Sequence, residues 1–161
     1  MVAVSCSRIE GHVVRHTPSV SENVNVDQRG GEWFVASYSQ TIPGFWQMNG
    51  WLCRLGSDSS DEAIGAAVEE ALEASETGVE RRSNAAAPLL EMVGLRTFGA
   101  YMRGTRSVGV MRDGEAVTIE PKRNEGARGG FSPLPDRFEV IHAPSRAELG
   151  NAVRRAFDRT L

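Results

Sequence analysis

The chain has 161 residues, of which 40% are hydrophobic and 24% charged, so it has the length and composition of one globular domain. Its formal net charge of −3 lacks the basic excess that nucleic-acid-binding domains usually carry. No stretch approaches the roughly 20 apolar residues of a membrane span. These features argue against a membrane protein and against a general nucleic-acid binder.

The first 31 residues have the least defined pattern. Val13 and Val14 could form a short strand, whereas Pro18 to Gly31 is polar and rich in turn residues, which predicts a loop. Residues 1–10 lack the apolar run of a signal peptide, so we expect none. We therefore predict a single domain over 1–161, with a poorly defined segment 1–31 and a core over 32–161.

The next part of the chain predicts a strand, a turn and a second strand. Residues 33–38 are aromatic and β-branched, which favours a strand. Residues 41–50 contain Pro43 and Gly44 and are predicted as a turn segment. A second strand is predicted over 51–55.

An amphipathic helix is predicted to follow. Ser59 or Ser60 can cap its N-terminus, and Glu62 stands three residues after Ser59, as a capping box requires. The helix is predicted to end between Ser75 and Gly78. Five apolar residues recur at helical spacing, which places them on one face: Ile64, Ala67, Val68, Ala71 and Leu72.

Two shorter helices and a hairpin are predicted in the middle of the chain. Pro88 can open a helix that Gly94 closes, and residues 97–102 form the second. Asp113–Gly114 between two alternating runs predicts a hairpin with a type I′ turn. The remaining predictions are strands over 107–111, 116–120 and 138–141, a Gly-rich loop over 124–130, a turn over 131–135 and a last helix from Ser145.

A strand–helix unit is predicted to occur twice, at an offset of 85 residues. Superposing Gly65 on Gly150 aligns Ser60 with Ser145 and matches the apolar positions of the two helices. Gly in a helix interior costs roughly 0.8–1.0 kcal/mol relative to Ala, so its recurrence indicates a steric need, such as close packing of the helix backbone on a sheet. The alternative is coincidence between two Ala-rich helices. The repeat predicts an α+β fold, with a mainly antiparallel sheet, packed helices and two pseudo-repeated halves.

Acidic residues cluster on the first of these helices and its flanks. The equivalent outer positions of the last helix carry Arg154 and Arg155. Either the two faces are solvated and attract each other, or the acidic face receives a basic partner. The candidate partner-binding residues are Asp58, Asp61, Glu62, Glu69, Glu70, Glu73, Glu76 and Glu80.

The sequence shows no catalytic or metal-binding motif. His12 and His16 have the spacing of a helical metal pair, but Val13 and Val14 between them favour a strand. No GxSxG, HExxH or P-loop pattern occurs. We therefore expect no metal, no cofactor and no enzymatic activity. Two cysteines, Cys6 and Cys53, lie far apart and outside any CxxC spacing, which predicts reduced thiols in a cytosolic protein.

A second hypothesis is a single-stranded nucleic-acid-binding module of Whirly-like architecture. It rests on basic residues with aromatic neighbours, which can bind single strands. These are Arg81, Arg82, Arg96, Arg103, Arg106, Lys122, Arg123 and Arg128.

Three segments, taken in order, make the chain resemble the immunity proteins of contact-dependent growth inhibition (CDI) systems of Gram-negative bacteria. They lie within residues 33–160 and comprise 61–72, a middle block over 94–131, and 147–157. The resemblance implies a cytoplasmic protein that binds and blocks the toxic C-terminal domain of a cognate exported effector, often a nuclease. It implies neither membrane contact nor catalysis, and it supplies no binding residues. An acidic surface would suit a toxin whose active site attracts phosphates.

Overall fold

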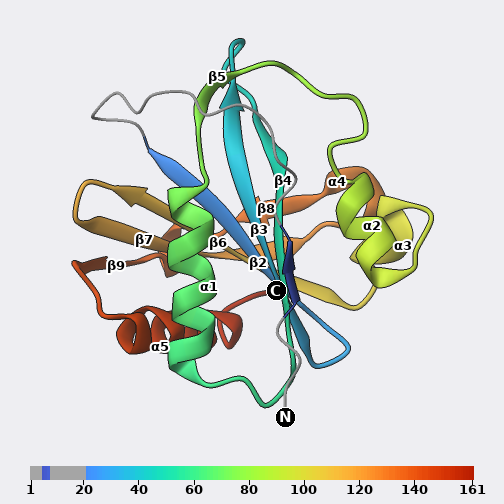
Figure 1. Ribbon diagram of the computed structural model, residues 1–161. Helices are drawn as coiled ribbons and strands as arrows, with labels where there is room; N and C mark the ends of the chain where they lie inside the picture. The colour runs from blue at the N-terminus through green and yellow to red at the C-terminus, as the bar shows by residue number, and fades with distance from the viewer. Residues whose placement is uncertain (1–4, 8–20) are drawn as a thin grey trace.

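The computed structural model describes residues 5–7 and 21–161 as an α+β fold in which nine strands form one sheet (Figure 1), as the sequence predicts. The strands are β1 (Ser5–Ser7), β2 (Glu22–Arg29), β3 (Glu32–Thr41), β4 (Trp46–Leu55), β5 (Thr77–Val79), β6 (Thr105–Asp113), β7 (Ala116–Asn124), β8 (Phe131–Pro133) and β9 (Glu139–His142). The helices are α1 (Asp61–Glu73), α2 (Ala87–Val93), α3 (Phe98–Met102), α4 (Gly126–Gly129), α5 (Arg146–Phe157) and a short 3-10 helix, η1 (Pro135–Arg137).

The sheet is mainly antiparallel, as predicted. Its strand order is β1-β4-β3-β2-β6-β7-β8, while β9 pairs with the first half of β7 and β5 runs parallel to the end of β3. Strands β2 and β6 pair at the centre. On either side of this pair, one helix follows a strand: α1 follows β4, and α5 follows β9.

The prediction of a loop over 18–31 is wrong for residues 22–29, which form strand β2. Val24 and Val26 are completely buried in the core, and the polar residues that alternate with them, Asn23, Asn25 and Asp27, face the other side of the sheet. Gly30 and Gly31, with φ of +58° and +78°, join β2 to β3 in the conformation that a type I′ turn requires. His12, His16 and the strand predicted at Val13–Val14 lie outside the described residues.

Strand β4 begins at Trp46, inside the segment predicted as a turn. Gly50 has a φ of +95°, and it lies where the pairing of β3 with β4 shifts register, so the strand absorbs it as an irregularity. The predicted hairpin after β6 is confirmed, but its turn type is wrong. The central residues are Gly114 and Glu115, and Gly114 alone has a positive φ, as in a type II′ turn.

The shorter predicted elements are largely confirmed. Helix α2 ends at Gly94, which has a φ of +71°, and Thr97 caps α3 by accepting a hydrogen bond from the Ala100 amide. The predicted strand over 138–141 is β9, shifted by one residue. The predicted loop over 124–130 contains the single turn of α4, and the predicted turn over 131–135 contains β8.

The two repeated helices have similar N-terminal caps. Ser60, not Ser59, caps α1, because its hydroxyl accepts a hydrogen bond from the Ala63 amide at 3.1 Å. A capping box opens α5: Ser145 accepts from the Glu148 amide, and the Glu148 carboxylate accepts from the Ser145 amide. None of the described helices is long and apolar enough to span a membrane.

The repeated glycines lie where α1 and α5 cross on the same face of the sheet (Figure 1). A Cβ placed on Gly65 would lie 1.7 Å from the Arg146 carbonyl oxygen, and one on Gly150 would lie 1.7 Å from the Asp61 carbonyl oxygen. The steric need inferred from the sequence is therefore present, but its source differs from the prediction. Each glycine packs on the backbone of the other helix rather than on the sheet.

Successive residues of β3 bury their side chains in two separate cores. Trp33 and Val35 face the larger core, beneath α1 and α5. Phe34 and Ala36 face the opposite side, where Leu89 of α2 and Tyr101 of α3 cover the sheet. Helices therefore cover both faces of the β3–β4 half.

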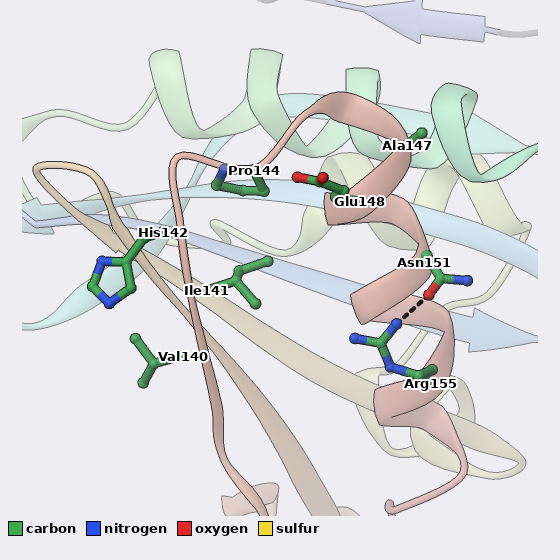
Figure 2. A pocket seen from close by; sticks show the side chains of 8 residues that line it. All are labelled: Val140, Ile141, His142, Pro144, Ala147, Glu148, Asn151 and Arg155. Carbon is green, nitrogen blue, oxygen red and sulfur yellow. Dashed lines mark hydrogen bonds between the residues drawn. The ribbon is translucent and has the colours of Figure 1, made fainter.

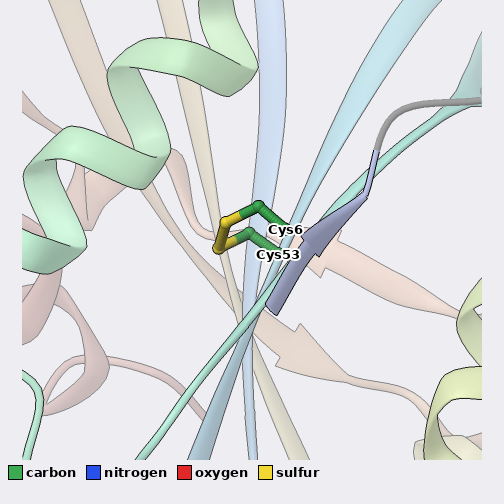
Figure 3. Close-up of a disulfide and its surroundings, with 2 residues drawn as sticks. All are labelled: Cys6 and Cys53. Atoms are coloured by element: carbon green, nitrogen blue, oxygen red, sulfur yellow. A yellow bond between two sulfur atoms is a disulfide. The ribbon is translucent and has the colours of Figure 1, made fainter. Parts of the chain in front are cut away.

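Cys6 and Cys53 form a disulfide between β1 and β4 (Figure 3), so the prediction of two reduced thiols is wrong. The two residues are directly opposite each other in the antiparallel pair, with their Cα atoms 4.1 Å apart. No sequence spacing indicates this bond, because it depends on the register of two strands that are distant in the chain.

Candidate functional site

The eight predicted acidic residues lie on α1 and in the segments on either side of it. The apolar face of α1 is buried, so its carboxylates lie on the remaining surface of the helix. Asp61 and Glu69 form ion pairs with α5, and Glu76 is half-buried. The other five are exposed: Asp58, Glu62, Glu70, Glu73 and Glu80.

Asp61 forms part of the contact between α1 and α5. Its carboxylate accepts hydrogen bonds from Arg154 Nε at 2.7 Å and from Asn151 Nδ2 at 3.1 Å. The Arg154 guanidinium, followed by Asn151, holds the pKa of Asp61 below its usual value. Arg154 also donates to the Ser59 carbonyl and lies over the Trp33 ring. The main role of Asp61 is therefore to stabilise the packing of α1 against α5.

Glu69 makes a second, weaker link to α5. Its carboxylate accepts from Arg146 at 3.3 Å, and this bond raises the pKa of Arg146. The acidic and basic faces of the two helices thus attract each other at two points, as the first of the two sequence interpretations proposes.

The exposed carboxylates of α1 remain available to a partner. We call Glu62, Glu70 and Glu73 the acidic surface; among the described residues none of them forms an ion pair. Glu70 and Glu73 also line a shallow cavity of about 340 Å³ together with Trp51 and Ala74. Trp51 itself is buried, so the two carboxylates are the groups that this cavity offers to a basic partner.

A larger groove lies between β9 and α5 (Figure 2). Its volume is about 580 Å³, and Val140, on its β9 wall, is 54% exposed. The Arg155 guanidinium donates to Asn151 on α5 and forms an ion pair with Glu139 at 2.6 Å. The residues that line the groove are Val140, Ile141, His142, Pro144, Ala147, Glu148, Asn151 and Arg155.

The groove runs beside an unpaired strand edge. Within the part of the chain that the structure describes, β9 pairs with β7 along one edge only. The free edge has unpaired backbone donors and acceptors, and an extended segment of another chain can add to such an edge while its side chains enter an adjacent groove.

The sequence predicts the strand over 138–141 but not the groove beside it. The signal is the adjacent pair Val140–Ile141, because neighbouring residues in a strand face opposite sides. Ile141 packs against the core, which leaves Val140 outward.

The sequence matches the family model of the CDI immunity proteins (CdiI) over residues 23–160. The chain belongs to the CDI immunity protein family. The match extends from β2 to the residues after α5, so it includes both halves of the sheet, the acidic surface and the groove.

Two solved structures share the fold of this CDI immunity protein. One is a protein of unknown function, NMB0488, from Neisseria meningitidis, with a TM-score of 0.75 and 16% identity over 92% of this chain and 100% of that one. The other is in a CdiA-CT/CdiI toxin and immunity complex from Yersinia pseudotuberculosis, with a TM-score of 0.73 and 20% identity over 89% of this chain and 100% of that one. No curated protein matches the sequence.

This CDI immunity protein also buries a polar group on the sheet face opposite α1 and α5. Asp27 is only 7% exposed; its carboxylate accepts from the Tyr101 hydroxyl at 2.6 Å, and burial raises the pKa of Asp27. Lys122 donates to Asn25 at 2.7 Å, and burial lowers the pKa of Lys122. Among the described residues, no group of three or more His, Cys, Asp or Glu side chains could hold a metal.

Four of the basic residues of the second hypothesis do not lie together in this family member. Lys122 is tied to Asn25, and Arg106 lies over the Phe157 ring. Arg81 and Arg82 instead lie beside Trp46, at a separate end of the sheet.

Proposed function

We propose that this CDI immunity protein acts in the cytoplasm, where it binds the toxic C-terminal domain of its cognate exported effector and blocks it without catalysing a reaction. The observation that carries the proposal is the family match over residues 23–160. The similarity to the fold in the Yersinia toxin and immunity complex supports it. The partner is therefore proposed to be a protein domain rather than a small molecule.

Two surfaces are proposed to contact the toxin. The groove between β9 and α5 offers apolar walls and a free strand edge, which suit an extended toxin segment. The acidic surface on α1 suits a basic patch. Because a nuclease attracts phosphates with basic residues, we propose that the cognate toxin is a nuclease.

The direct test is co-expression of the chain with the toxin domain encoded next to it, followed by co-purification and a growth assay. We expect rescue of growth and a stable one-to-one complex. The proposal is wrong if the two purified proteins fail to associate at micromolar concentrations.

A matched pair of variants tests the groove. Val140→Asp places a charge on its apolar wall and is expected to weaken binding by about tenfold or more, since a buried unpaired charge is costly at an interface. The control is Leu161→Asp, which should bind like the unaltered protein. Leu161 is 52% exposed, close to the exposure of Val140. Equal binding by both variants would exclude the groove.

A separate assay tests the nuclease assignment. Degradation of DNA or RNA by the free toxin would support the assignment, and absence of degradation would refute it.

A further inference from the structure

The turn between β3 and β4 displays apolar side chains on a well-supported backbone. The Thr41 amide donates to the Phe45 carbonyl at 2.8 Å, and the Phe45 amide donates to the Thr41 hydroxyl at 3.1 Å. The Ile42 amide donates to the Val79 carbonyl of β5 at 3.0 Å. Ile42 is nevertheless 73% exposed and Phe45 is 66% exposed. Exposed apolar side chains on a backbone fixed in this way are typical of contact surfaces.

Two arginines are held next to this turn by the side chain of Gln47. Its amide nitrogen donates to the Glu80 carbonyl at 2.9 Å, and its amide oxygen accepts from the Arg82 amide at 3.1 Å. These two hydrogen bonds hold the backbone of this segment beside β4. Arg81 and Arg82 line one cavity of about 310 Å³ together with Phe45 and Trp46. Among the described residues, neither arginine forms an ion pair, and both are exposed.

We call Ile42, Phe45, Trp46, Arg81 and Arg82 the aromatic–arginine tip. We propose that it is a third docking surface for the cognate toxin domain, and that it receives a segment carrying a carboxylate beside an apolar side chain. This inference rests on the proposed function. Arginine and aromatic residues dominate the binding energy of protein interfaces, and a guanidinium binds a carboxylate through a planar, bidentate contact.

A protein segment fits the tip better than a nucleic-acid strand does. The most exposed of its apolar side chains is Ile42, which is aliphatic and offers no ring for a base to stack on. The β3–β4 turn lies apart from β9 and α5 (Figure 1), and the tip and the groove share no lining residue, so each can be tested while the other is intact.

The experiment measures the dissociation constant of the complex with the purified toxin domain for two tip variants and two matched controls. The variants are Phe45→Ser and the double change Arg81→Glu with Arg82→Glu. The controls are Leu161→Ser, an exposed apolar residue elsewhere, and Arg123→Glu with Arg128→Glu, two exposed arginines outside the tip. Circular dichroism confirms that each variant is folded.

We expect each tip variant to bind the toxin domain at least about tenfold more weakly than the unaltered protein, and the controls to change by less than about twofold. Failure of the unaltered protein to bind would refute the proposed function itself. Binding by the unaltered protein with no difference between tip variants and controls would overturn the docking surface alone.

A cross-linking measurement identifies the chemistry of the occupant. Arg82→Lys keeps the charge and supplies an amine that a carbodiimide couples to a carboxylate in contact with it. We expect mass spectrometry to find Lys at this position joined to an Asp or Glu of the toxin domain. Absence of that cross-link in a complex that forms normally would contradict the proposal. A second result would also contradict the proposal. In it, the protein binds a single-stranded oligonucleotide tightly, and the double arginine change abolishes that binding but leaves toxin binding unaffected.

Discussion

Gly65 of α1 and Gly150 of α5 are equivalent residues of the repeat, and each makes room for the other helix. The carbonyl that a Cβ on Gly65 would strike belongs to Arg146, and the one that a Cβ on Gly150 would strike belongs to Asp61. Asp61 and Arg146 are themselves related by the same offset of 85 residues. The helix crossing therefore has a local two-fold pseudo-symmetry that the sequence repeat follows.

Replacing either glycine by alanine is expected to destabilise the protein. Helix propensity alone would favour alanine by roughly 0.8–1.0 kcal/mol. A Cβ 1.7 Å from a backbone oxygen must separate the helices, and we expect a net loss of about 2 kcal/mol or more in the free energy of unfolding. Urea unfolding checks this. In the double variant the losses should not add, because both changes open the same crossing. Added stability in either single variant would contradict the close packing.

Asp27→Asn is expected to flatten the pH dependence of stability. Because the pKa of Asp27 is raised in the folded protein, the folded state holds its proton more tightly than the unfolded chain does. Stability is therefore expected to fall as pH rises from the ordinary Asp pKa through the raised one. Asparagine still accepts from Tyr101 but does not titrate, so this fall should vanish in urea unfolding measured at several pH values. Asp136→Asn, at an exposed carboxylate, is the control that should retain it.

Asp61→Asn is expected to have the opposite effect on acid stability. The lowered pKa of Asp61 contributes stability above the ordinary Asp pKa, and this is lost as pH falls through the folded-state value. Because both partners of the ion pair are partly exposed, we expect a cost below about 1 kcal/mol at neutral pH. The difference from the unaltered protein should shrink in acid. A difference that stays constant down to strongly acidic pH would show that the charge of Asp61 contributes little.

Reversing the charge of the acidic surface should slow association with the toxin. For Glu70→Lys with Glu73→Lys we expect an association rate about tenfold lower at low salt, and a smaller difference at high salt, because exposed charges steer encounter and are screened. Stopped-flow mixing measures this rate. The matched control is Glu91→Lys with Asp136→Lys, which makes the same change of net charge away from α1. Equal slowing by both pairs would show that net charge, not the acidic surface, steers association.

Reduction of the disulfide should lower the free energy of unfolding. The bond joins residues 47 positions apart. Constraining a loop of this length in the unfolded chain is expected to contribute about 2–4 kcal/mol. Unfolding with and without a thiol reductant measures this. Cys6→Ser should match the reduced protein and be insensitive to the reductant. An unaltered protein whose stability the reductant does not change would contradict the bond.

The sequence alone determined those elements whose signals are local. The caps and apolar faces of α1 and α5 involve residues within a few positions of each other, so periodicity and capping chemistry predict both helices. The Asp113–Gly114 pair predicts its hairpin for the same reason. The alternating residues of β2, followed by Gly30–Gly31, carry a comparable signal, which the polar composition of that segment obscured.

Only the tertiary structure decided how these elements meet. Asp61 is tied to Arg154, whereas Glu70 and Glu73 stay free, because the angle of the helix crossing determines which carboxylates face α5. The Cys6–Cys53 bond depends on the register of β1 with β4, and the groove exists because β9 lies at a sheet edge beside α5. These features join residues far apart in the chain, and local propensity carries no information about such distances. The sequence therefore identified α1 and its flanks as acidic, and the fold decided which of those carboxylates remain available to a partner.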